Sequence, residues 1–133
     1  MAQPDDAVVT KLAAAGLGLT SGTNVFAGRI RPQGSGVPFA SVFCEATGGP
    51  VNQPYLGNAA DWRVKTVQVR VRSDPRAFET GQTLARGCLT ALHRAALTGY
   101  TWCYVREPHP TYLQQDESGC HHWTLNVELG VKE

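Results

Sequence analysis

A strictly alternating segment near the C-terminus constrains the fold more than any other feature of this sequence. From Trp123 to Val131 apolar and other residues alternate with a period of two. The apolar set is Trp123, Leu125, Val127, Leu129 and Val131, and the set between them is Thr124, Asn126, Glu128 and Gly130. Such alternation is typical of an antiparallel strand with one face buried and the other in water or against a partner. Burial of each large apolar side chain is worth about 1.5–3 kcal/mol, so we expect this strand to anchor the core.

The residues before this segment predict a hairpin. Pro108 and Pro110 break the chain, a short strand-like segment follows, and residues 116–119 (Asp-Glu-Ser-Gly) have turn composition. The carboxylates of Asp116 and Glu117 are interpreted as ordinary solvated turn residues. His109, between the two prolines, is interpreted as a loop residue.

The remaining pattern predicts two helices and further strands in a chain of 133 residues, which suits one domain covering residues 1–133. Predicted helices span residues 5–15 and run from Asp74-Pro75 to about Leu97–Gly99, and predicted strands span Asn24–Ile30, Phe39–Glu45, Trp62–Arg72 and Tyr100–Glu107. The expected fold class is α+β: a mostly antiparallel sheet with one long helix packed on one face, plus a short N-terminal helix. Gly81 and Gly87 inside the long helix each cost up to about 1 kcal/mol relative to alanine, and a close contact with the sheet or a partner would explain them.

The predicted strand Trp62–Arg72 changes its apolar face midway. Trp62 and Val64 fall on one face, whereas Val67, Val69 and Val71 fall on the other. A β-bulge near Lys65–Thr66 would restore the phase. Alternatively, the first half of the strand faces something other than the core, as expected where a sheet continues into a neighbouring subunit.

Residues 47–60 form a long segment rich in glycine, proline and asparagine, which contains Tyr55 and Leu56. Loops of this length in small domains are usually functional or mobile. We therefore expect either an arm that reaches another subunit, anchored by Tyr55 and Leu56, or a disordered surface hairpin.

Charge is nearly balanced, with a formal net charge of +1, which argues against a protein built for broad nucleic-acid binding. Five basic residues nevertheless cluster within fourteen positions: Arg63, Lys65, Arg70, Arg72 and Arg76. They are interpreted either as a solvated strand face protected against edge aggregation or as a positive surface beside DNA or an acidic partner subunit.

The four cysteines (Cys44, Cys88, Cys103, Cys120) are widely spaced, and we expect reduced, buried thiols. Cys120-His121-His122 suggests a metal site, but adjacent strand residues point to opposite faces, and a zinc site needs three or four ligands. Cys103 or His109 could complete such a set.

No paired nucleophile and base stands out, because Cys88 and His93 do not share a helix face. The prediction is a non-enzymatic protein without cofactor or metal, with a small metal- or thiol-dependent enzyme as the alternative. The N-terminus lacks the features of a signal peptide and no segment is long enough to span a bilayer. A soluble protein without a membrane partner is therefore expected.

The element order and several local phrases resemble the tail terminator proteins of long-tailed bacteriophages, also described as tail completion or minor capsid proteins. The resemblance covers nearly the whole layout, and its specific phrases lie in residues 62–131. These phrases are Val67–Arg72 leading into Asp74–Glu79, Pro110–Leu113, the Asp116–Gly119 turn and Trp123–Glu128.

The resemblance implies a structural virion protein that forms a ring, typically a hexamer, on the completed tail tube. Such a ring ends tube polymerisation and joins the tail to the head connector, while genomic DNA passes through its lumen without sequence-specific binding. Implied partners are further copies of the chain, the tail tube protein and the connector or neck protein. The expected location is the head-proximal end of the virion tail, with the host cytoplasm during assembly.

Two sets of residues are candidates for these contacts. The subunit-interface candidates are Tyr55, Leu56, Trp62 and Val64, and the lumen- or partner-facing basic candidates are Arg63, Lys65, Arg70, Arg72 and Arg76. A head-side connector or neck protein of the same virion is the alternative, because small α+β folds recur among such proteins.

Overall fold

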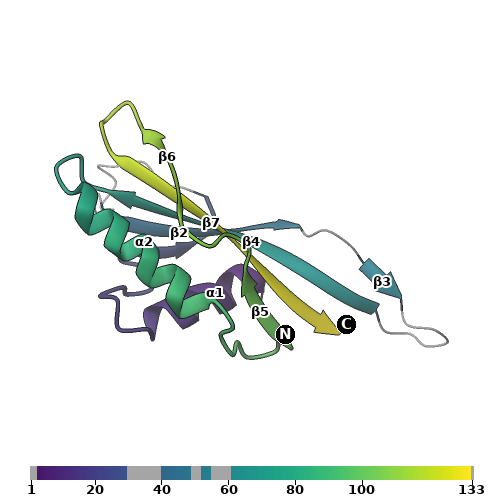
Figure 1. Cartoon of the computed structure of the whole chain (residues 1–133). Helices are drawn as coiled ribbons and strands as arrows, with labels where there is room; N and C mark the ends of the chain where they lie inside the picture. Colours follow the sequence, from purple (N-terminus) through teal and green to yellow (C-terminus); the bar gives the residue numbers. More distant parts are fainter. Residues whose placement is uncertain (1–2, 30–39, 49–51, 55–60, 133) are drawn as a thin grey trace.

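The structure, a computed structural model, describes residues 3–29, 40–48, 52–54 and 61–132. Its elements in chain order are α1 (Pro4–Ala13), β1 (Val25–Ala27), β2 (Ser41–Gly48), β3 (Asn52–Pro54), β4 (Asp61–Ser73), α2 (Phe78–Leu92), β5 (Trp102–Val105), β6 (Thr111–Gln115) and β7 (His121–Lys132) (Figure 1). The α+β class predicted from the sequence is confirmed, and β6 and β7 form the predicted C-terminal hairpin. None of the helices within the described ranges has the length and apolar composition of a membrane span.

The sheet is built around one long antiparallel pair, β4 with β7. Their register runs without interruption from Trp62 opposite Lys132 to Ser73 opposite His121. β2 and β3 pair with successive parts of β4 on its other side, and β6 and β5 do the same along β7. β1 extends the sheet beyond β2 and is parallel to it. The molecule is therefore an elongated two-stranded ladder with shorter strands attached along both sides.

Both helices cover one face of this sheet (Figure 1). α1 contributes Val8 and Leu12 to the core, and α2 contributes Ala85, Cys88 and Leu92. The apolar set predicted for the last strand is buried on the same side, with no member more than 2% exposed: Trp123, Leu125, Val127, Leu129 and Val131. The alternation in the sequence therefore identified the core strand correctly.

The predicted bulge in β4 is wrong. The pairing of β4 with β7 contains no register shift, and the irregularity lies on the partner strand β2, between Ala46 and Gly48. Because β4 alternates regularly, Val67, Val69 and Val71 face the helices, whereas Trp62 and Val64 lie on the opposite face. The change of phase marks the point where the helix-covered part of the sheet ends.

The main helix is shorter than its sequence pattern predicted. Residues 74–77 form a turn in which the Asp74 carboxylate accepts the backbone N–H of Arg76 at 2.9 Å, and α2 begins only at Phe78. At the other end His93 has extended backbone angles and Arg94 has a positive φ of 59°. This left-handed residue ends the helix well before Gly99, where the apolar periodicity suggested its end.

Candidate assembly surfaces

The turn between β6 and β7 is organised by the carboxylate of Asp116. Oδ1 accepts the backbone N–H groups of Ser118 and Cys120, each at 2.9 Å, and Oδ2 accepts the Nε2–H of His122 at 2.9 Å. Burial acts to raise the pKa of Asp116, but the hydrogen bonds from His122 and from the backbone outweigh it and hold this pKa below its ordinary value. The sequence-based interpretation of Asp116 as a merely solvated carboxylate is therefore wrong.

The two neighbouring histidines lie on opposite faces of β7, as the strand geometry predicted. His121 faces the helix side, where its Nε2–H donates to the carbonyl of Pro75 at 3.2 Å and its Nδ1 lies 2.9 Å from the Tyr112 hydroxyl. His122 faces away from the helices and is bound to Asp116. Across the described ranges, no three histidine, cysteine or acidic side chains are arranged to hold a metal.

All four cysteines are free thiols, and all four are buried. Burial raises the pKa of the Cys88 thiol to about 12 and that of the Cys103 thiol to about 11. It also raises the pKa of Cys44 well above its ordinary value. Cys103 donates its S–H to the carbonyl of Leu92 at 3.2 Å. The prediction of buried, core-filling thiols is confirmed.

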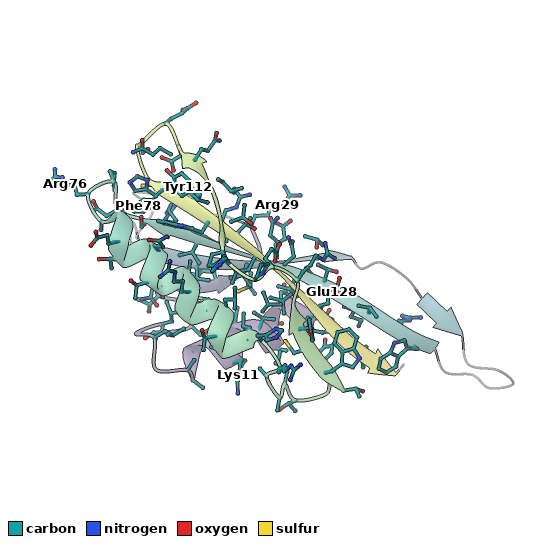
Figure 2. The ribbon with its side chains drawn as sticks, in the orientation of Figure 1. Lys11, Arg29, Arg76, Phe78, Tyr112 and Glu128 are labelled. Carbon is teal, nitrogen blue, oxygen red and sulfur yellow. The ribbon has the colours of Figure 1, made fainter. Side chains whose placement is uncertain are left out.

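An exposed aromatic patch lies at the end of the sheet where α2 begins (Figure 2). The ring of Phe78 lies 5.4 Å from that of Tyr112, 5.1 Å from that of His121 and 5.3 Å from that of buried Trp123. Phe78 and Tyr112 are about 40% exposed. Leu113 is equally exposed, but it lines the cavity with Arg70 and His122 on the other side of the sheet. Phe78 is half open to solvent because it lies at the first turn of α2, at the rim of the sheet.

On the sheet face turned away from the helices, polar groups mix with buried aromatic rings. The guanidinium of Arg72 lies 5.1 Å from the ring centre of Phe43, and that ring stacks on Phe26 at 5.6 Å. Burial lowers the pKa of Arg72, which is only 2% exposed. Arg70 lies between two cavities of about 250 Å³ each, one toward Glu45 and the other toward the β6–β7 turn.

The five clustered basic residues do not form one surface. Because β4 alternates without interruption, Arg63 and Lys65 lie on the helix side of the sheet, and Arg70 and Arg72 lie on the other side. Arg76 is exposed in the turn before α2. These five residues are close in the sequence, but in the structure they are divided between the two faces of the sheet and the turn before α2.

Of the four subunit-interface candidates, two can be placed. Trp62 and Val64 are half-buried near the free end of β4, and the ring of Trp62 lies 6.3 Å from that of Trp102. Trp102 in turn covers Gly130, where any Cβ would collide with the indole. Tyr55 and Leu56 lie outside the described residues.

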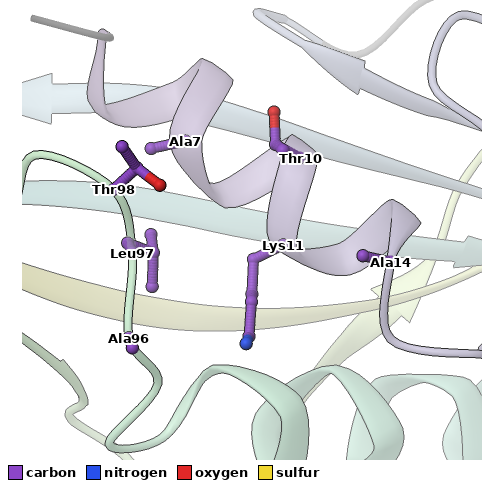
Figure 3. Close-up of a pocket in the computed structure, with 7 residues that line it drawn as sticks. All are labelled: Ala7, Thr10, Lys11, Ala14, Ala96, Leu97 and Thr98. Carbon is purple, nitrogen blue, oxygen red and sulfur yellow. The ribbon is translucent and has the colours of Figure 1, made fainter.

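A mostly apolar groove lies on the helix side, between α1 and the segment after α2 (Figure 3). Its volume is about 300 Å³. The lining residues are Ala7, Thr10, Lys11, Ala14, Ala96, Leu97 and Thr98. Among the described residues of this lining, Lys11 is the only ionisable side chain.

These features define a two-layer α+β fold in which both helices cover one face of the sheet. The fold resembles that of a solved chain described as the virion of a native gene transfer agent (GTA) particle, with a TM-score of 0.65 and 18% sequence identity. The match covers 98% of this chain and 95% of that chain. At this identity the likeness establishes the fold. No protein-family model matches the chain, and a search of curated proteins found no match.

Proposed function

We propose that this chain is a non-enzymatic structural virion protein that forms a ring at the head-proximal end of a phage-type tail. The ring, which we expect to be a hexamer, caps the tail tube, ends its polymerisation and joins it to the head connector. Genomic DNA passes through the lumen without sequence-specific contacts. The observation that carries the proposal is the end-to-end fold likeness to a chain of a gene transfer agent virion.

The shape of the sheet supports an assembly role. The β4–β7 ladder is long for a chain of this size, and its end with β3 extends beyond the part of the sheet covered by the helices (Figure 1). Exposed large apolar side chains gather at the opposite end around β6. Contiguous apolar surface of this kind in a folded protein commonly marks a protein–protein contact.

The alternative within the same particle is a head-side connector or neck protein. The same fold likeness supports both positions, because it does not depend on where in the virion the chain sits. The phenotype of particles that lack the protein separates the two.

The test is electron microscopy of particles from the phage or phage-like element that encodes this chain, after in-frame inactivation of its gene and with a plasmid copy as the control. Overlong or unattached tails beside DNA-filled heads support the terminator role. Tails of normal length beside heads that have lost their DNA favour the neck position. Normal tails of normal length joined to filled heads would contradict both.

A further inference from the structure

Two of the outer strand edges of this sheet, those of β5 and β1, are blocked by the chain itself. Along the outer edge of β5, Arg94 donates its backbone N–H to the carbonyl of Cys103 at 3.0 Å, and Val105 donates its N–H to Nδ1 of His93 at 3.2 Å. Along the outer edge of β1, Gly22 donates its N–H to the carbonyl of Val25 at 3.0 Å. Such capping is how folded proteins prevent further strands from adding to a sheet.

On the outer edge of β6, no described residue provides such protection. All five of its residues are exposed, and β6 pairs only with β7 among the strands that the structure describes. Tyr112 and Leu113 on this strand are 42% and 40% exposed. The ring of Phe78 lies next to that of Tyr112, so apolar surface borders this edge on the helix side (Figure 2). An open edge beside exposed aromatic rings has the features of a site for strand addition.

Among the described residues, a second strand edge without a partner lies at the far end of the same ladder. Within the described ranges, β3 pairs only with β4, opposite residues Asp61–Arg63. β6 instead pairs with β7 next to the other end, where Ser73 faces His121. The two open edges therefore lie at opposite ends and on opposite sides of the ladder. At about 3.3 Å per residue, they are separated by roughly 30 Å.

We propose that the open edge of β6, with the Phe78–Tyr112 patch, receives the β3 edge of a second copy of this chain, so that the sheet continues from subunit to subunit. The contact joins two different surfaces of the same chain, and contacts of that type close into rings when the rotation between subunits permits. This inference rests on the proposed ring and specifies how its subunits are joined.

Disulfide trapping in assembled particles tests the inference. The double variant Gln53→Cys with Gln114→Cys places one thiol on β3 and one on β6, and Gln53→Cys with Leu113→Cys covers the neighbouring register. A disulfide requires Cα atoms about 4.4–6.8 Å apart, so the two positions cannot be bridged within one chain. The native cysteines are buried and do not compete. The matched control is Gln53→Cys with Tyr104→Cys, because Tyr104 is equally exposed but lies on the capped strand β5.

Particles are purified from cells in which the variant replaces the native chain, oxidised mildly, and separated on gels with and without reductant. We expect a series of reducible multimers, several-fold more abundant for a β6 variant than for the β5 control. If the chain is present in particles but neither β6 variant exceeds the control, the strand contact is overturned and the virion role stands. If the chain is absent from particles, the proposed function fails and the contact fails with it.

A charge placed on the open edge provides a second measurement. Leu113→Lys adds a lysine to an exposed edge strand, a device that natural sheets use to prevent pairing. We expect several-fold lower incorporation of this variant into particles, while its thermal unfolding stays unchanged. Tyr104→Lys, the matched variant on the capped strand, should be incorporated normally. Equal incorporation of both variants would argue against strand addition at β6.

Discussion

At the scale of single residues, Asp116 determines the geometry of the hairpin that carries β6. Its two carboxylate oxygens hold the backbone of the turn and fix the ring of His122. The neighbouring Glu117 has the same charge and lies at the exposed tip of the turn. The pair therefore offers a matched comparison between a carboxylate that orders the turn and one that does not.

Replacing Asp116 with asparagine is expected to destabilise the chain at neutral pH by about 1 kcal/mol, since charge-assisted hydrogen bonds are lost at a partly exposed site. The folded-state pKa of Asp116 lies below its ordinary value. Its contribution is therefore present above that ordinary value and is lost as the pH falls through the folded-state pKa. Urea unfolding of both proteins from about pH 7 down to about pH 3 should show the difference shrinking in acid. A Glu117→Gln variant serves as the control, and an equal loss in that variant would contradict the role of Asp116.

The buried thiols lead to a second prediction at this scale. Because burial raises the pKa values of Cys44, Cys88 and Cys103, few thiolates form at neutral pH, and a thiol reagent cannot reach them. Labelling of the native protein with a chromogenic disulfide should therefore be slow, and it should reach four thiols per chain after denaturation. Rapid labelling of even one cysteine in the folded protein would show that the core opens locally.

At the scale of elements, the two glycines of α2, Gly81 and Gly87, differ in the atoms that a Cβ would meet. A Cβ at Gly81 would lie 2.6 Å from Cζ3 of Trp123 and would also meet Ser73, so the helix approaches the sheet too closely for a side chain. A Cβ at Gly87 would meet only the end of the Leu17 side chain, at 2.7 Å. The side chain of Leu17 can rotate, whereas the sheet cannot move away.

Gly81→Ala is therefore expected to destabilise the fold by about 1–3 kcal/mol through overpacking. Gly87→Ala should be neutral or should stabilise by up to about 1 kcal/mol, because alanine favours the helix. Thermal unfolding of the two variants beside the parent protein checks the contrast. Similar losses in both variants would mean that Leu17 is held as firmly as the sheet.

At the scale of the whole molecule, the two ends of the β4–β7 ladder have different surfaces. One end carries β3, which lies within the predicted arm of residues 47–60, and the other carries β6 and the aromatic patch. The combined variant Tyr55→Ala with Leu56→Ala, which changes the predicted arm, is expected to reduce ring or tube contacts and leave the fold intact. Circular dichroism reports the fold, and native mass spectrometry together with particle incorporation reports assembly. Unchanged assembly would remove these two residues from the interface.

The sequence by itself determined the elements whose pattern is local. Strict alternation from Trp123 to Val131 identified the core strand, and turn residues at 116–119 identified the hairpin, because period and turn chemistry are properties of neighbouring residues. The same alternation correctly separated His121 from His122. The α+β class followed from the order of these elements.

Only the tertiary structure decided how distant segments meet. The uninterrupted register between β4 and β7 shows that the basic residues of β4 lie on two faces of the sheet, and the bulge lies on β2. Register depends on both paired strands, so the sequence of one strand does not determine it. The outer edge of β5 is blocked by His93 and Arg94, which lie about ten residues earlier in the chain. Which strand edges remain open, and at which end of the ladder each lies, follows from such long-range pairing, which no local pattern in the sequence encodes.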